Sequence, residues 1–204
     1  MDLSDPTRNW RSAVSAALAA QGAGSSDFEL NTHLPRPRRD ELRPAAVLVG
    51  LIDGAGGPEV LLTKRSSKLR HHPGQIAFPG GKQDDGDADA ETCALREAHE
   101  EVGLPMGHVE VIGRLPGHET VTGFAMTPVV GWITQPFTAR PEAGEVTEAF
   151  QVPLAHVADT GRFRIEGRRW RGARRLYYTV PWGPYYIWGA TARMLRGLAE
   201  RMQP

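Results

Sequence analysis

Residues 79 to 104 predict a loop, a helix and a second loop in direct succession. The Pro79-Gly80-Gly81 turn allows close approach of the backbone, because glycine has no Cβ. The run from Ala90 to Val102 consists largely of helix formers, and Gly103 is a usual helix terminator. The apolar face of this helix is formed by Leu95, Ala98 and Val102. We therefore expect a loop–helix–loop unit that packs onto the domain through that face.

The polar side of this helix carries three carboxylates, on Glu97, Glu100 and Glu101. Residues three and four apart meet on a helix, and like charges there repel by a few tenths of a kcal/mol per pair. A divalent cation removes that cost. Oxygen ligands without Cys or paired His favour Mg²⁺ or Mn²⁺, and Mg²⁺ usually shares its ligands with substrate phosphates. The helix thus predicts a metal site for a phosphate ester or anhydride; a merely solvated acidic face is the alternative.

Composition predicts one compact domain of ordinary character. The 204 residues include 24 Lys and Arg against 24 Asp and Glu, so no global field attracts nucleic acid or an anionic membrane. The single cysteine, Cys93, excludes an intrachain disulfide and is typical of a reducing compartment. The N-terminus lacks a secretory pattern, and no run of 18 apolar residues occurs. We expect a cytoplasmic protein without a membrane partner.

The order of patterns predicts an α/β (α+β) fold. Residues 1–39 are expected to form an N-terminal helix, at 10–20, and a Pro-rich linker arm outside the core; the domain itself spans 40–204. Strands are expected at 45–52, 59–63, 109–112 and 124–134, with Pro128 marking an edge or a bulge. A hairpin at 163–180 and a closing helix at 190–202 complete a mixed sheet with helices on its faces.

The loop–helix–loop unit is similar to the signature of a known family. Gly81, followed by Arg96-Glu97-Ala98-His99-Glu100-Glu101-Val102-Gly103-Leu104, resembles the Nudix hydrolase pattern G-x5-E-x7-R-E-U-x-E-E-x-G-U, in which U is apolar. The resemblance implies a Nudix fold and Mg²⁺-dependent hydrolysis of a nucleoside diphosphate linked to another moiety. It makes Glu97, Glu100 and Glu101 metal ligands, and Arg96 would orient these glutamates through its guanidinium.

The spacing departs from the family pattern at one point. One extra residue lies between Gly81 and Arg96, so the first acid of the signature falls on Asp87 counting forward or on Ala88 counting back. The three metal-binding glutamates lie beyond this insertion. The departure therefore concerns only the role of the first acid.

The preceding segment resembles the second motif of the coenzyme A pyrophosphatases, a Nudix subgroup that tolerates the longer spacing. This resemblance implies cleavage of coenzyme A to adenosine 3′,5′-bisphosphate and 4′-phosphopantetheine. The residues that it implies for substrate binding are Arg65, Lys68, Arg70, His72, Gln75, Gly80 and Gly81. Four cations in seven residues, Lys64, Arg65, Lys68 and Arg70, also supply a local field for phosphates. The alternative is a solvated basic loop.

A proton acceptor for the attacking water is expected on a loop outside the metal helix. Glu145 is our candidate, because the segment from Glu145 to Leu154 resembles a further piece of the same subgroup. Its neighbours Glu142 and Glu148, and the more distant Glu119, are alternatives.

An arginine-rich hairpin between residues 162 and 175 resembles a nucleic-acid surface in composition. Its arginines are Arg162, Arg164, Arg168, Arg169, Arg171, Arg174 and Arg175. A solvated edge hairpin whose charges block sheet pairing is favoured, so we expect a small nucleotide as partner and no nucleic acid. The rivals are hydrolysis of ADP-ribose, a dinucleotide or capped RNA, and a catalytically silent Nudix domain that binds nucleotide or RNA. The sequence leaves the oligomeric state open.

Overall fold

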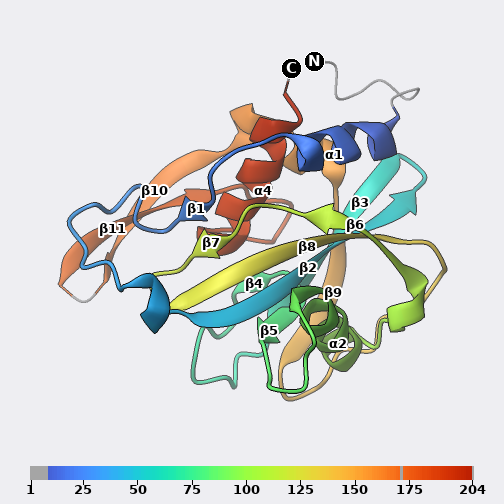
Figure 1. Cartoon of the computed structure of the whole chain (residues 1–204), viewed down its shortest axis with the longest axis horizontal. Helices are drawn as coiled ribbons and strands as arrows, with labels where there is room; N and C mark the ends of the chain where they lie inside the picture. Colours follow the sequence, from blue (N-terminus) through green and yellow to red (C-terminus); the bar gives the residue numbers. More distant parts are fainter. Residues whose placement is uncertain (1–8, 171, 204) are drawn as a thin grey trace.

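The computed structural model describes residues 9–170 and 172–203. They form a mixed β-sheet covered by helices (Figure 1). The helices are α1 (Trp10–Ala19), α2 (Ala90–Val102), α3 (Leu154–Val157) and α4 (Gly189–Arg201), with 3-10 turns at Arg39–Glu41, Met106–His108 and Thr160–Arg162. The strands are β1 (Ser25–Ser26), β2 (Arg43–Gly54), β3 (Gly57–Arg65), β4 (Ile76–Ala77), β5 (Gly80–Lys82), β6 (Val109–Arg114), β7 (His118–Glu119), β8 (Phe124–Ile133), β9 (Val146–Pro153), β10 (Arg164–Trp170) and β11 (Ala173–Thr179).

The centre of the sheet is the parallel pair of β2 and β8, in register from Arg43 opposite Phe124 to Ile52 opposite Ile133. The strand order is β1-β7-β8-β2-β3-β4, while β5 pairs with β2, β6 with β8 and β9 with β3. β2 and β3, at the first two predicted strands, form an antiparallel hairpin. The sheet mixes parallel and antiparallel pairs, which confirms the predicted α+β class.

Each face of the sheet is buried by its own set of helices. Successive side chains of β2 alternate between the two faces, so Leu48 packs with Ala94 and Ala98 of α2 while Val49 packs on the other side. That other side is covered by α1 and α4, which bury Val14 and Ala17 of α1 and Met194, Leu195 and Leu198 of α4. No helix among the described residues is both long and apolar enough to cross a membrane.

Helix α2 has the predicted bounds, and both ends are capped locally. The Asp89 carboxylate accepts a hydrogen bond from the backbone N–H of Thr92 at 2.8 Å. Gly103 ends the helix with φ of 70°, a left-handed conformation that glycine adopts without strain. These caps and the small residues of the packed face hold the carboxylates of α2 beside β5, with which the helix is in contact.

The N-terminal segment contributes to the same core and sheet as the rest of the chain. Val14 and Ala17 of α1 are fully buried, and β1 pairs in parallel with β7. The amide of Asn31 bonds both backbone groups of Leu176, at 2.9 and 2.8 Å, as a strand partner would. Phe28 and Asn31 are buried, so the expectation that the arm after α1 lies outside the core is wrong for this part of the arm. A domain boundary at residue 40 stays a prediction.

Pro128 lies inside the sheet rather than at an edge. Strand β8 runs between β2 on one side and β6 and β7 on the other. The Pro128 carbonyl accepts from the N–H of Leu115 at 2.9 Å, in the gap between the end of β6 and the start of β7. The N and C=O of one strand residue point to the same side, so the nitrogen of Pro128 also faces this gap. The absence of an N–H there therefore removes no hydrogen bond between neighbouring strands.

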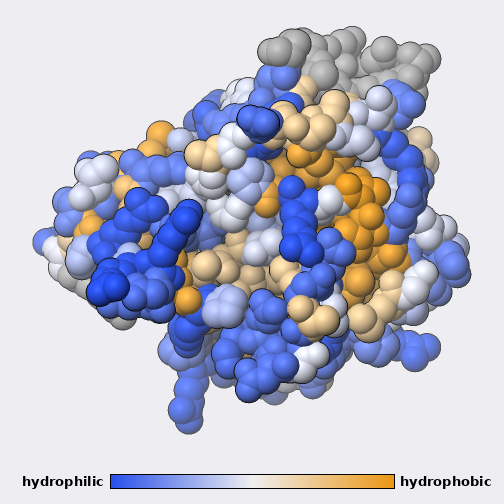
Figure 2. Space-filling model, viewed as in Figure 1, coloured by the Kyte–Doolittle hydropathy of each residue, from blue (hydrophilic) through white to orange (hydrophobic). Residues whose placement is uncertain are grey.

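The arginine-rich segment forms the predicted hairpin, a separate sheet of β10 and β11. Hydrophilic residues gather over the end of the molecule built by the N-terminal arm and this hairpin (Figure 2). Not all of its arginines are solvated, however. The side chain of Arg175 is 7% exposed and pairs with Asp27 at 2.7 Å. Arg171 lies outside the described residues.

Candidate active site

Glu101 is a buried carboxylate at the end of α2, with 4% of its side chain exposed. Its Oε2 accepts the backbone N–H of Gly80 at 3.2 Å, and Nη1 of Arg65 lies 4.0 Å from its Oε1. Burial raises the pKa of Glu101 to about 8, although both contacts act to lower it. At 4.0 Å, the charge of Arg65 does not offset the effect of burial on the pKa of Glu101.

Glu97 lies one turn earlier, directly against the glycine pair of β5. A Cβ on residue 81 would come within 2.5 Å of the Glu97 carboxyl, and one on residue 80 would collide with the carbonyl of Ala46. Residue 80 also has φ of 154°, which favours glycine. Burial raises the pKa of Glu97, and the charges of Glu100 and Glu145 raise it further. The two glycines therefore let the chain pass close to the α2 carboxylates.

Arg96 connects the carboxylates around it. Its guanidinium makes two parallel bonds of 2.9 Å to Asp87, and its Nη1 donates to Glu97 at 3.0 Å and to Glu100 at 2.9 Å. The Asp87 side chain is 3% exposed, and Arg96 holds its pKa well below the usual range. Asp87, not Ala88, therefore provides the carboxylate at the inserted position, where it anchors Arg96.

The predicted metal ligands suit a hard divalent cation in chemistry but do not form a closed ligand set. Among the described residues, no three His, Cys, Asp or Glu side chains are grouped to hold a metal ion. Arg96 binds one oxygen of Glu97 and one of Glu100, while Glu101 faces Gly80. The pKa values of Glu97 and Glu101 are raised, and a cation bound among these oxygen atoms would lower both pKa values.

Three of the four candidates for the proton acceptor are already engaged. Glu142 accepts the backbone N–H groups of Gly144 and Glu145, at 2.7 and 2.9 Å. Glu148 accepts the hydroxyl of Tyr185. Glu119 is bound by Arg36 and Arg39, and its hydrogen bond with Arg36 holds its pKa below the ordinary value. The carboxylates of all three therefore already accept hydrogen bonds within the protein.

Glu145 differs from the other three. It is exposed, and its carboxylate has no hydrogen-bond or ion-pair partner within residues 9–170 and 172–203. Its backbone carbonyl accepts the N–H of Ser66 at 2.8 Å, which ties the loop to the end of β3. Its charge raises the pKa values of both Glu97 and Glu101, so it lies near the metal helix. These observations support Glu145, which remains a prediction.

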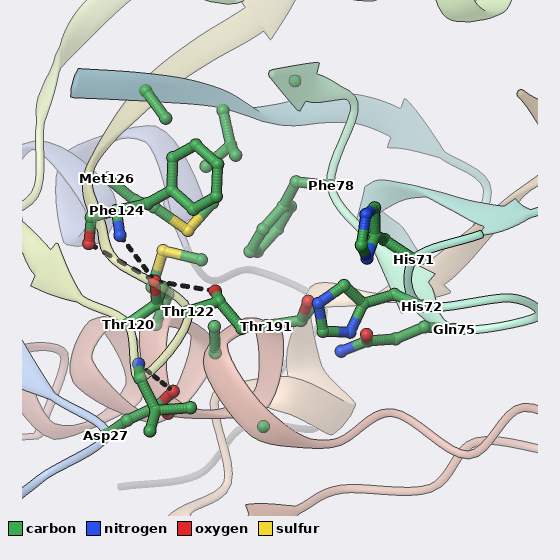
Figure 3. Close-up of a pocket in the computed structure, with 18 of the residues that line it drawn as sticks. Asp27, His71, His72, Gln75, Phe78, Thr120, Thr122, Phe124, Met126 and Thr191 are labelled. Atoms are coloured by element: carbon green, nitrogen blue, oxygen red, sulfur yellow. Dashed lines mark hydrogen bonds between the residues drawn. The ribbon is translucent and has the colours of Figure 1, made fainter. Parts of the chain in front are cut away.

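Five predicted substrate residues line one central cavity of about 590 Å³: Arg65, His72, Gln75, Gly80 and Gly81. Phe124 and Met126 of β8 face this cavity on one side, and Phe78, His72 and Gln75 on the other (Figure 3). The buried Nε of Arg65 has no partner in the described chain. Arg65 thus offers an unused donor to a ligand in the cavity, close to Glu101.

The remaining two predicted substrate residues lie elsewhere. Arg70 lines an adjoining cavity of about 660 Å³, together with Lys64 and Arg168. We call it the basic cavity, after these three residues. Lys68 is exposed and lines neither of these two cavities. The structure therefore brings most of the basic segment to the site and leaves Lys68 on the surface.

The far end of the central cavity is built by residues that sequence analysis missed, with Asp27 at their centre. Its carboxylate accepts Arg175 Nη2 at 2.7 Å and the N–H of Val121 at 3.0 Å, and it lies 3.6 Å from Nε2 of the buried His118. Burial acts to raise the pKa of Asp27, but His118, Arg175 and Val121 outweigh it and lower the pKa. No local pattern marks these residues, because they come from distant segments.

Comparison with known proteins identifies the family. The model of the NUDIX domain matches residues 41–170. Nudix hydrolase NudL of Escherichia coli K12, described as uncharacterized, is 44% identical over 85% of this chain and 92% of its own length, and NudL of Enterobacter sp. is 43% identical with the same coverage. The NUDIX domain of Shewanella oneidensis NrtR, solved with ADP-ribose, has the same fold, with a TM-score of 0.51 at 16% identity over 87% of this chain and 97% of that chain.

The family match and the NudL relatives agree with the fold and with the Arg96 to Gly103 signature on α2. Nudix hydrolases are pyrophosphohydrolases that act on phosphoanhydride bonds of nucleoside diphosphate derivatives, and they generally use divalent metal ions. The chain belongs to the Nudix hydrolase family.

Proposed function

We propose that the chain cleaves the diphosphate linkage of coenzyme A or its derivatives, giving adenosine 3′,5′-bisphosphate and 4′-phosphopantetheine, in the cytoplasm. The observation that carries this proposal is the meeting of the basic segment and the acidic helix. Arg65 lies 4.0 Å from Glu101, and the same residue lines the central cavity. A diphosphate at that point would contact a cation and lie beside the carboxylates of α2.

Each residue has a stated role in this proposal. Glu97, Glu100 and Glu101 would hold Mg²⁺ or Mn²⁺, which supplies positive charge beside the diphosphate. Arg96 is a positioning residue, because it already fixes one oxygen of Glu97 and one of Glu100 while Asp87 anchors it. Arg65 would donate its free Nε to a phosphate oxygen. Glu145 would accept the proton of the attacking water.

A substrate panel tests the proposal directly. We expect the highest kcat/KM for coenzyme A when the protein and Mg²⁺ are incubated with coenzyme A, ADP-ribose, NADH and nucleoside triphosphates. Chromatography should show adenosine 3′,5′-bisphosphate and 4′-phosphopantetheine as the products. A preference for ADP-ribose would leave a Nudix hydrolase of different specificity and would refute the coenzyme A assignment.

Substitution of the loop carboxylate tests the proton acceptor. Glu145→Gln should lower kcat by about 100-fold with little change in KM, because a general base acts on the reacting water rather than on substrate affinity. Glu142→Gln is the matched control: an amide oxygen can still accept the N–H groups that Glu142 binds, so its activity should stay near that of the parent. Equal losses in the two variants would show that the loop conformation matters and not the carboxylate of Glu145.

A further inference from the structure

The basic cavity adjoins the central cavity, and the two share the side chains of one wall. The shared residues are His71, His72, Gln75, Thr122 and Trp188. The lining of the basic cavity contains three cations, Lys64, Arg70 and Arg168, and no carboxylate. Within residues 9–170 and 172–203, these three cations form no ion pair. An anionic group that entered this cavity would therefore meet uncompensated positive charge.

Arg168 reaches this cavity from the arginine-rich hairpin, a segment that the sequence analysis placed on the solvated edge. Its guanidinium lies 4.1 Å from the ring centroid of Trp188, the residue before α4, and 6.0 Å from that of Tyr177. Stacking on an aromatic face restricts the guanidinium plane while leaving its N–H groups available. Arg168 is thus held on one wall of the cavity, and Arg70 belongs to the loop between β3 and β4 that forms another.

Two tyrosines complete the basic cavity, and each is fixed by a neighbouring carboxylate. The Tyr185 hydroxyl donates to Glu148, and the Tyr185 ring stacks on Phe150 with centroids 3.6 Å apart. The Tyr186 hydroxyl donates to Glu166 at 2.6 Å. The two nearby carboxylates thus accept hydrogen bonds from the tyrosine hydroxyls. The tyrosines themselves line the cavity. Cations beside fixed aromatic rings suit a phosphate carried by a planar base.

We propose that the basic cavity is a binding site for the phosphomonoester of a nucleoside, with Arg168 and Arg70 as the residues that recognise the phosphate. The inference rests on the proposed function in one respect: in coenzyme A this group is the 3′-phosphate of the adenosine end. Arg65 and Gly81 line the central cavity beside the α2 carboxylates, and this cavity shares lining residues with the basic cavity. One ligand would therefore extend from one cavity into the other. Arg168 then determines specificity for the 3′-phosphate although it lies outside every motif of the sequence.

The inference is tested with two pairs of ligands that differ in the 3′-phosphate and with one pair of variants, Arg168→Ala and Arg169→Ala. Arg168→Ala should lower kcat/KM for coenzyme A by about 10- to 150-fold, the value of a charge-assisted contact to phosphate, and should change that for dephospho-coenzyme A little. Arg169→Ala is the control, because Arg169 is exposed on the same strand and lines neither cavity. Arg70→Ala should act as Arg168→Ala does, and the losses of the double variant should not add if both arginines bind one phosphate.

Calorimetry with the products separates this inference from the proposed function. The parent should bind adenosine 3′,5′-bisphosphate more tightly than AMP, which lacks the 3′-phosphate, and Arg168→Ala should abolish the difference. If that holds while coenzyme A is not cleaved, the proposed function fails and the site stands. Equal affinities for the two nucleotides in the parent would overturn the site, as would equal losses on coenzyme A and dephospho-coenzyme A in Arg168→Ala.

Discussion

Glu101→Gln is expected to lower kcat by at least about 1,000-fold at saturating Mg²⁺. In the proposed site Glu101 is a metal ligand, and a metal stabilises the negative charge that develops in the transition state by several kcal/mol. Of the three α2 glutamates, Glu101 is the most deeply buried, which leaves little room for water to replace its oxygen. Its position between Gly80 and Arg65 also sets where the metal and the diphosphate would meet. Glu100→Gln should reduce turnover by at least about 100-fold.

Two measurements separate a site effect from a folding effect. The metal-free Glu101→Gln protein should be no less stable to urea than the parent, since an isosteric amide relieves repulsion among crowded carboxylates and can still accept the N–H of Gly80. Glu91→Gln, on the first turn of the same helix, should retain parental turnover, because Glu91 bonds the distant Arg114. Parental activity in Glu101→Gln would remove this residue from the site.

Asp27→Asn is expected to lower the free energy of unfolding by about 3 kcal/mol, because it removes the carboxylate charge that pairs with the buried guanidinium of Arg175. Both side chains are less than one-tenth exposed, so solvent cannot replace the lost contact. Asp40→Asn is the matched control on the same arm. Its pair with Arg38 is largely exposed, and its loss should cost less than about 1 kcal/mol. Urea denaturation of the two variants gives the comparison, and equal effects would contradict the buried pair.

Acid titration should show the same pair through its pH dependence. The pKa of Asp27 is lowered from its ordinary value of 3.8 in the folded protein, so ionised Asp27 contributes stability that is present above pH 3.8. That contribution is lost as the pH falls below 3.8 toward the folded pKa. The parent should therefore lose more stability than Asp27→Asn in this acid range. Parallel stability curves for the two proteins would count against the ion pair.

Asp27 and Arg175 also line the central cavity, so the arm forms part of the wall of that cavity. The bonds of Asn31 to Leu176 fix the arm on β11 in the same region. An observer of the sequence alone would assign residues 25 to 31 to a linker, since Gly and Ser dominate before them and Pro after them. In the folded protein Ser26, Phe28 and Asn31 are buried. Ser26 pairs with β7, and Asn31 bonds Leu176 of β11.

What the sequence determined by itself is local. Asp89 and Gly103 give α2 both of its ends through short-range backbone bonds, and the helical repeat alone puts Glu97, Glu100 and Glu101 on neighbouring positions. Two β-prone apolar runs and the Gly-rich segment between them predict β2 and β3 together with their hairpin, because the turn spans only a few residues. These features depend on contacts within about a dozen residues, which a one-dimensional pattern records.

What only the tertiary structure decided depends on pairing between distant segments. The parallel register of β2 and β8 joins residues about 80 apart, and the Asp27–Arg175 contact joins residues 148 apart. Such pairs bring Phe124, Asp27 and Arg175 to one cavity. Arg168 likewise faces the basic cavity only because the hairpin packs beside Trp188. The register of the strands and the connections between them are determined by burial of the whole core. The spacing of residues within one segment therefore does not show which side chains of distant segments come into contact.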